Sequence, residues 1–124
     1  MAGSVQVPWY ATVFRGDQFE EALHEIAPLA LRYGAQDFQV YRSRDDRYKF
    51  LHASTFETKL EWDRYWYGPE FSYWRTKYQS YFQVPVVYGW TKLVVRGSLL
   101  GEEEAADHTA AGGDTEAVSG DLAG

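Results

Sequence analysis

The sequence predicts one α+β domain, and three observations support this. Two stretches, 17–33 and 58–82, space their apolar residues as helices do, and strand-like alternation separates and flanks them. The element order is strand, helix, strand, strand, helix, strand. A length of 124 residues has room for one such domain. This order is that of the ferredoxin-like fold, a four-stranded antiparallel sheet with helices on one face.

The predicted strands cover 7–14, 36–43, 48–56 and 84–96, and residues 1–6 are expected to form a flexible leader. The strands are rich in β-branched and aromatic residues. The first and last have apolar residues on both faces, so the face without helices also needs a cover. A second copy of the chain would supply it, which predicts a homodimer with two facing sheets, a dimeric α+β barrel.

The two polar positions Asp17 and Glu20 have the spacing of a capping box, which predicts the start of the first helix. Gly34 is a natural C-terminal stop. Pro28 lies within this helix and predicts a kink or a change of direction.

The second helix has the same start signal, with Thr58 and Glu61 at capping-box spacing. Gly68 interrupts it, and Pro69 suits the first turn of a restarted helix.

Aromatic side chains dominate this second helix: ten of the 21 residues from 62 to 82 are Trp, Tyr or Phe. Phe71, Trp74, Tyr78 and Phe82 fall on one face, the spacing of a buried stripe. Eight of the ten are Trp or Tyr, whose polar atoms need partners when buried. Dry cores favour Leu, Ile and Val, so we expect a hollow between this helix and the strands.

Two further residues are candidates for catalysis. His52 lies in a predicted strand beside aromatic residues, where it is either an interior residue or a group that moves protons. Arg75 lies beside the aromatic stripe, where a guanidinium can hold a carboxylate or phenolate or stack on a ring.

Charge and composition exclude several functions. Residues 1–97 hold 12 Lys and Arg against 11 Asp and Glu, whereas 98–124 hold seven acids and no basic residue. A near-neutral domain argues against nucleic acid as a partner. The tail is low in large apolar residues and is expected to be disordered.

The chain has no cysteine, and its three histidines show no metal-ligand spacing, so no metal is expected. Phosphate-binding glycine loops and a nucleophile elbow are absent too. Residues 1–8 lack a signal-peptide pattern, and no apolar run is long enough to span a bilayer. We therefore expect a cytoplasmic protein without a membrane partner.

The pattern Phe56-x-x-Lys59-x-x-Trp62-x-x-Tyr65, followed by Phe71, resembles a known family when taken with the element order and size. It is similar to the antibiotic biosynthesis monooxygenase-type members of the dimeric α+β barrel superfamily. The resemblance implies a homodimer in which each subunit holds a pocket between its helices and sheet.

Members of that family include cofactor-free oxygenases of aromatic polyketides and haem-degrading enzymes. Both branches use an asparagine with a tryptophan, and the haem branch adds a histidine on the second helix. This chain has no asparagine and no histidine from 57 to 83, where Arg75 falls near the expected place. Trp66 alone carries over, as a pocket tryptophan, and we expect no cofactor.

The sequence leaves two main functions open. In the first, the dimer is a cofactor-independent monooxygenase or related enzyme acting on a flat aromatic or polyketide-like molecule. His52 would then shuttle a proton, and Arg75 would offset an enolate or phenolate. The candidate substrate-binding residues are Trp66, Trp74, Tyr78 and Tyr88. In the second, the homodimer binds a ligand unchanged or uses its aromatic residues for subunit adhesion.

A third, minor alternative is an RNA-recognition module, which shares the element order. The run Arg47-Tyr48-Lys49-Phe50-Leu51 is similar to the third-strand signature of those domains. Arg47 and Lys49 replace small residues of that signature, and Ala53 stands where an aromatic belongs.

Overall fold

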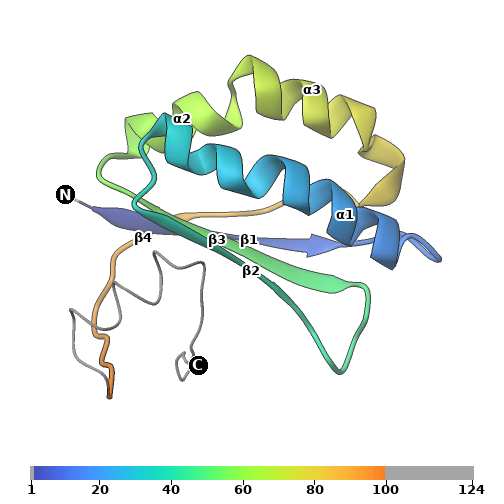
Figure 1. The fold of residues 1–124 in the computed structure, drawn as a ribbon, viewed down its shortest axis with the longest axis horizontal. Coiled ribbons are helices and arrows are strands. Elements are labelled where there is room, and N and C mark those ends of the chain that lie inside the picture. Colours follow the sequence, from blue (N-terminus) through green and yellow to red (C-terminus); the bar gives the residue numbers. More distant parts are fainter. Residues whose placement is uncertain (1, 100–124) are drawn as a thin grey trace. The chain divides into compact units, whose positions relative to one another are not determined.

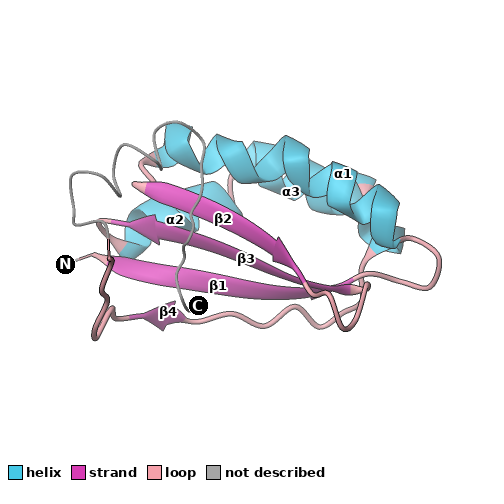
Figure 2. Cartoon of the chain, turned by 60° about the horizontal axis from the view of Figure 1, so that its bottom comes forward, coloured by secondary structure: helices cyan, strands magenta, loops and turns pink. Residues whose placement is uncertain are grey.

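Four antiparallel strands form one sheet in the order β2-β3-β1-β4. They are β1 (Gly3–Tyr10), β2 (Asp37–Arg42), β3 (Lys49–Phe56) and β4 (Trp90–Thr91). β1 pairs with β3 along its whole length, from Gly3 opposite Phe56 to Tyr10 opposite Lys49. The helices cover one face of the sheet (Figure 1). The predicted ferredoxin-like fold is confirmed, and Figure 2 shows its central pair of strands.

The computed structural model describes residues 2–99. The chain divides into two units, Met1–Lys92 and Leu93–Gly124. In the second unit, the described residues 93–99 are exposed and lie in no helix or strand. The predicted disordered tail, from residue 100 onward, lies outside the described residues.

Two strand boundaries differ from the prediction. β1 begins at Gly3, so residues 3–6 belong to the sheet and the predicted leader is wrong there. Val13 and Phe14 lie beyond β1 in an exposed turn, with Phe14 at φ 67°. β4 is two residues long where a strand over 84–96 was predicted. Most of that stretch carries the β-branched residues of a strand but pairs with no neighbour inside the described chain.

The first helical stretch is an α-helix, α1 (Gly16–Ile26), followed by a 3₁₀-helix, η1 (Ala27–Tyr33). Pro28 lies in the first turn of η1, so the predicted change of direction takes the form of a change of helix type. Gly34 ends η1 at φ 106°, as predicted.

The second helical stretch contains α2 (Lys59–Trp66), α3 (Pro69–Lys77) and a 3₁₀ turn, η2 (Gln79–Tyr81). The capping box of Thr58 and Glu61 and the restart at Pro69 are confirmed.

The predicted capping box at the start of α1 is wrong. Arg15 is the N-terminal cap and makes no capping hydrogen bond with its side chain. Asp17 and Glu20 instead accept hydrogen bonds from Arg42 of β2, each at 2.8 Å. The tertiary ion pair has taken the carboxylates that would have capped the helix, and it ties α1 to the sheet edge.

The open face of the sheet is less apolar than predicted, because β1 covers Gly3–Tyr10 and not 7–14. Its residues from β1 are Ser4, Gln6, Pro8 and Tyr10, and Leu51 of β3 lies opposite Pro8. Tyr10 is 41% exposed and Leu51 is 39% exposed. A small apolar patch therefore lies on a mixed surface.

Candidate functional site

The helix-covered face of the sheet holds a cluster of buried rings, which we call the aromatic interior. Its members come from β1, α2 and α3: Trp9, Trp62, Trp66, Phe71 and Trp74. Trp62 stacks on Trp66 at 5.4 Å between ring centroids, and Phe71 lies 4.7 Å from Trp66 and 5.4 Å from Trp74. The rings are in mutual contact where the sequence predicted a hollow.

Three polar atoms of these rings and their neighbours have partners on α1. Trp74 Nε1 donates to the Ala22 carbonyl at 2.7 Å, and Tyr65 donates to the Ile26 carbonyl at 2.6 Å. The Tyr78 hydroxyl donates to Glu25 at 2.5 Å, and this bond raises the pKa of Tyr78. The aromatic residues therefore fasten α2 and α3 to α1, and the hydroxyls facing α1 are not available to a ligand.

His52 is 1% exposed and lies on the helix-covered side of β3. Its Nδ1 accepts a long hydrogen bond, 3.4 Å, from Trp9 Nε1. An indole nitrogen can only donate, so the proton of the neutral imidazole sits on Nε2. Burial lowers the pKa of His52 to about 4, so the ring is neutral near pH 7.

Arg75 of α3 is half-buried against the same rings. Its guanidinium lies 4.3 Å from the Trp66 ring centroid and 5.1 Å from that of Phe71. Nη1 donates to the Trp66 carbonyl at 2.8 Å. No carboxylate pairs with Arg75 within the described part of the chain. Burial lowers its pKa, and the phenols of Tyr88 and Tyr67 act in the opposite direction.

Tyr88 covers the outer side of the stacked pair Trp62 and Trp66. Its ring lies 5.1 Å from Trp62 and 4.9 Å from Trp66. Burial raises the pKa of Tyr88, and so does a hydrogen bond with Tyr67. Tyr88 belongs to the segment 83–89, which lies outside every strand and helix.

Three buried polar atoms lie on this side of the sheet without a hydrogen-bond partner among the described residues: His52 Nε2, Ser54 Oγ and Trp62 Nε1. The Trp62 indole is close enough to influence the Tyr88 hydroxyl but is not aligned to donate to it. Buried donors are nearly always satisfied in native proteins, by protein, water or ligand. Unpaired donors among flat rings are suited to an oxygen atom on a flat ligand.

Known structures share this architecture. An antibiotic biosynthesis monooxygenase matches with a TM-score of 0.67 at 9% identity, covering 77% of this chain and 100% of the other. SnoaB, a cofactor-independent oxygenase from Streptomyces nogalater, matches in a mutant form with a TM-score of 0.64 at 15% identity, covering 79% and 96%. Rv0793 from Mycobacterium tuberculosis matches with a TM-score of 0.68 at 12% identity, covering 79% and 100%.

This chain has the antibiotic biosynthesis monooxygenase fold. Compared by sequence, it matches no protein-family model and no curated protein. Identities this low establish the shared fold, and the activity has to be argued from the residues of the site.

The residues do not suit a metal or haem. The described residues contain no group of three or more His, Asp or Glu side chains that could hold a metal ion. α3, which would carry the histidine of the haem-degrading branch, has none, and Arg75 cannot replace it as a ligand. No described helix is long and apolar enough to cross a membrane.

The structure brings some predicted site residues together and separates others. Trp66, Tyr88 and Arg75 are in contact, and His52 joins them through Phe71, whose ring centroid is 6.3 Å from that of His52. Trp74 also contacts Phe71, but its indole nitrogen donates to the Ala22 carbonyl of α1, and the Tyr78 hydroxyl is bound to Glu25 of α1.

Sequence reasoning missed Trp9 and Trp62 as site residues. Trp9 orients His52, and Trp62 is an unpaired donor. Trp62 precedes Trp66 by one helical turn, and that spacing could have identified it.

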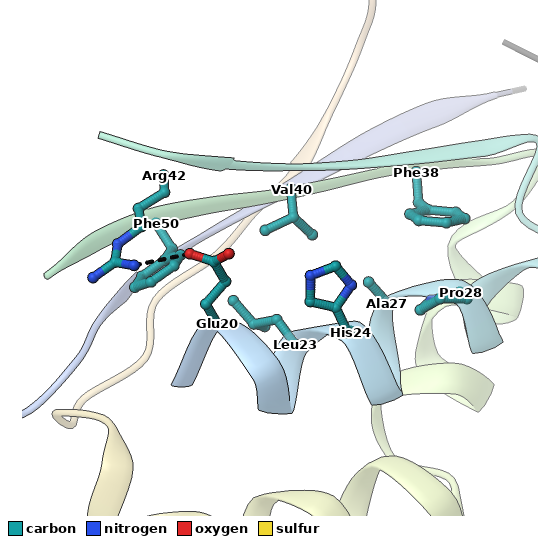
Figure 3. A pocket seen from close by; sticks show the side chains of 9 residues that line it. All are labelled: Glu20, Leu23, His24, Ala27, Pro28, Phe38, Val40, Arg42 and Phe50. Carbon is teal, nitrogen blue, oxygen red and sulfur yellow. Dashed lines mark hydrogen bonds and ion pairs between the residues drawn. The ribbon is translucent and has the colours of Figure 1, made fainter. Parts of the chain in front are cut away.

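A cavity of about 310 Å³ lies on the helix-covered face, between α1 and the edge strand β2 (Figure 3). Its polar residues are Glu20, His24 and Arg42. The alternation of Phe38, Val40 and Arg42 along β2 was visible in the sequence. The space between this strand and the helices α1 and η1 was not.

Proposed function

We propose that this protein binds a flat aromatic molecule against Trp66 and Tyr88 and oxidises it without a cofactor. The observation that carries the proposal is the buried, unpaired Nε2–H of His52 within a wall of rings. The fold that the chain shares with SnoaB, a cofactor-independent oxygenase, supports it.

Tyr88 is the proposed gate. It lies on a segment outside the sheet ladder, and its displacement would uncover the faces of Trp62 and Trp66. A flat ligand would then stack on Trp66, with the displaced Tyr88 ring against its other side. Ring-on-ring contact of this kind is geometrically specific and adds to the free energy of apolar burial.

The two predicted catalytic residues have different roles in this proposal. His52 donates a hydrogen bond from Nε2 to a ligand oxygen, because its Nδ1 is occupied by Trp9 and its low pKa makes it a weak base. Arg75 stabilises the negative charge of an enolate or phenolate, since it is half-buried and has no carboxylate partner.

The probe substrate for the proposed reaction is 1,8-dihydroxyanthrone, a flat phenol. Loss of a proton from the ring CH₂ to a water molecule gives an enolate, which transfers electrons to O₂. One oxygen atom becomes the new carbonyl, the other leaves as water, and the two CH₂ hydrogens supply that water. The dioxygen is the only oxidant, so the step needs no cofactor.

The test measures oxygen uptake and binding of the same probe to the full-length protein. We expect one O₂ consumed per anthrone, and at least tenfold slower turnover in both H52F and R75A. The matched control is Y73F, which changes an exposed tyrosine of α3 and should keep the full rate. Equal rates in all four proteins would remove His52 and Arg75 from the mechanism.

The second candidate is a non-catalytic homodimer, and the mutual contact of the rings favours it. If the interior only packs, planar phenols such as 2-naphthol will not quench the tryptophan fluorescence. Binding without oxygen uptake would indicate a carrier for such molecules.

We further propose that two copies pair through the open face of the sheet, at the patch around Tyr10 and Leu51. L51E places a charge in that patch and should convert a dimer into a monomer by light scattering. E21K, at an exposed position of α1 and so away from the open face of the sheet, is the control. A wild-type monomer would refute the pairing.

A further inference from the structure

The cavity between α1 and β2 is a second candidate site, separate from the aromatic interior. Its floor is apolar and buried, with Leu23, Ala27 and Phe50 each no more than 2% exposed. Phe38 and Val40 of β2 are half-buried and face the helix across the opening (Figure 3). A volume of about 310 Å³ is in the range of small-molecule sites.

Two polar side chains of α1 border the cavity one helical turn apart. The Glu20 carboxylate binds Arg42 with Oε1, and its Oε2 has no hydrogen bond to the described residues. The His24 ring stands between helix and strand, and neither nitrogen is hydrogen-bonded in the described chain (Figure 3). Both side chains can therefore accept a hydrogen bond from a ligand.

The charges around the cavity favour a cation. α1 contains Asp17, Glu20, Glu21 and Glu25 and no Lys or Arg. The nearby cation, Arg42, is already held by Asp17 and Glu20 and by the Arg47 carbonyl. Asp17 and Glu20 on Arg42 Nη1 already compensate its charge and would repel a ligand carboxylate, whereas an ammonium group can use Glu20 Oε2 directly.

We propose that this cavity binds a small arylalkylamine, with its ring between the helix and β2 and its ammonium group on Glu20 and His24. The ring replaces solvent against Phe38 and Val40, and the ammonium group satisfies the open carboxylate oxygen. The site contains neither His52 nor Arg75, so its test does not depend on the proposed oxygenase activity.

Three compounds that share the indole ring system and differ in their side group test the proposal: tryptamine, 3-methylindole and indole-3-acetate. Amide shifts of the full-length protein at pH 7 locate and measure the binding. We expect tryptamine to shift residues 20–27 and 38–42 with a Kd of about 1 mM or below, a fragment-sized affinity. Indole-3-acetate should bind at least tenfold more weakly.

Two variants separate the contribution of the Glu20 charge from that of the cavity volume. E20Q should weaken tryptamine about tenfold and leave 3-methylindole unchanged. E21Q removes a charge from the exposed neighbouring position and is the control, with wild-type affinity expected. V40F should abolish binding of all three indoles because it fills the cavity without altering a charge.

Three results would overturn the proposal: equal affinity for the three indoles, equal effects of E20Q and E21Q, or shifts around Trp66 and Tyr88 with none at α1. The last would assign the indoles to the aromatic interior.

Discussion

The aromatic interior and the α1–β2 cavity lie under the same helical layer and differ in how they are filled. In the interior, large rings from three elements touch one another at 4.7–6.0 Å between centroids. In the cavity, the side chains of α1, η1 and β2 leave about 310 Å³ between them. The two regions therefore differ in packing, and the polar atoms of Tyr65, Trp74 and Tyr78 have partners on α1.

The largest effect should come from a substitution that empties part of the interior. W74A removes a 3% exposed indole and its bond to the Ala22 carbonyl, and should lower the free energy of unfolding by about 3–5 kcal/mol. V40A, beside a space that already exists, should cost about 1 kcal/mol. Urea denaturation measures both values, and similar losses would mean that the two regions are packed alike.

A second prediction concerns how His52 makes the free energy of unfolding depend on pH. Its pKa is about 4 in the folded chain and 6.5 when unfolded. The unfolded state therefore binds more protons between these pH values, and the free energy of unfolding falls as the pH drops from 6.5 to 4. The loss should reach about 3 kcal/mol near pH 4.

H52F removes the titrating group and should flatten the stability curve in this window. Arg42 lowers the pKa of Asp17 below 3.8, so the stability from that carboxylate is present above pH 3.8 and is lost only on further acidification. Denaturant melts at several pH values between 4 and 7 separate the two effects. A wild-type slope in H52F would show that His52 is not buried as a neutral ring.

The sequence was sufficient for the fold and for much of the second helix. Thr58, Glu61, Pro69 and Gly34 act through local backbone chemistry, which a short stretch of sequence contains in full. The failures involve distant partners. Asp17 has capping-box spacing, but Arg42, 25 residues away, takes its carboxylate. β1 starts early because β3 pairs with it from Gly3 onward.

The candidate site was predicted in part for the same reason. The aromatic stripe pointed to Arg75 and the family resemblance pointed to Trp66, and the two contact each other within the helical segment. The tautomer of His52 depends on Trp9, 43 residues away across the sheet. Volume left between α1 and β2 is a property of two elements together, so no pattern along either one reveals it.

The smallest predicted effect compares the starts of the two helices that border these regions. T58A removes the side chain that accepts from the Glu61 amide at the start of α2, and should cost about 1 kcal/mol of unfolding free energy. D17A removes no cap, because Arg15 occupies that position without a side-chain bond, and it breaks ion pairs in which Asp17 itself is exposed. Its effect should be smaller than that of T58A and should shrink further in 1 M salt, whereas the T58A effect should not. Urea melts at low and high salt test this. If D17A matched T58A at both salt concentrations, Asp17 would be capping α1 in solution, and α1 would owe its start to local sequence as α2 does.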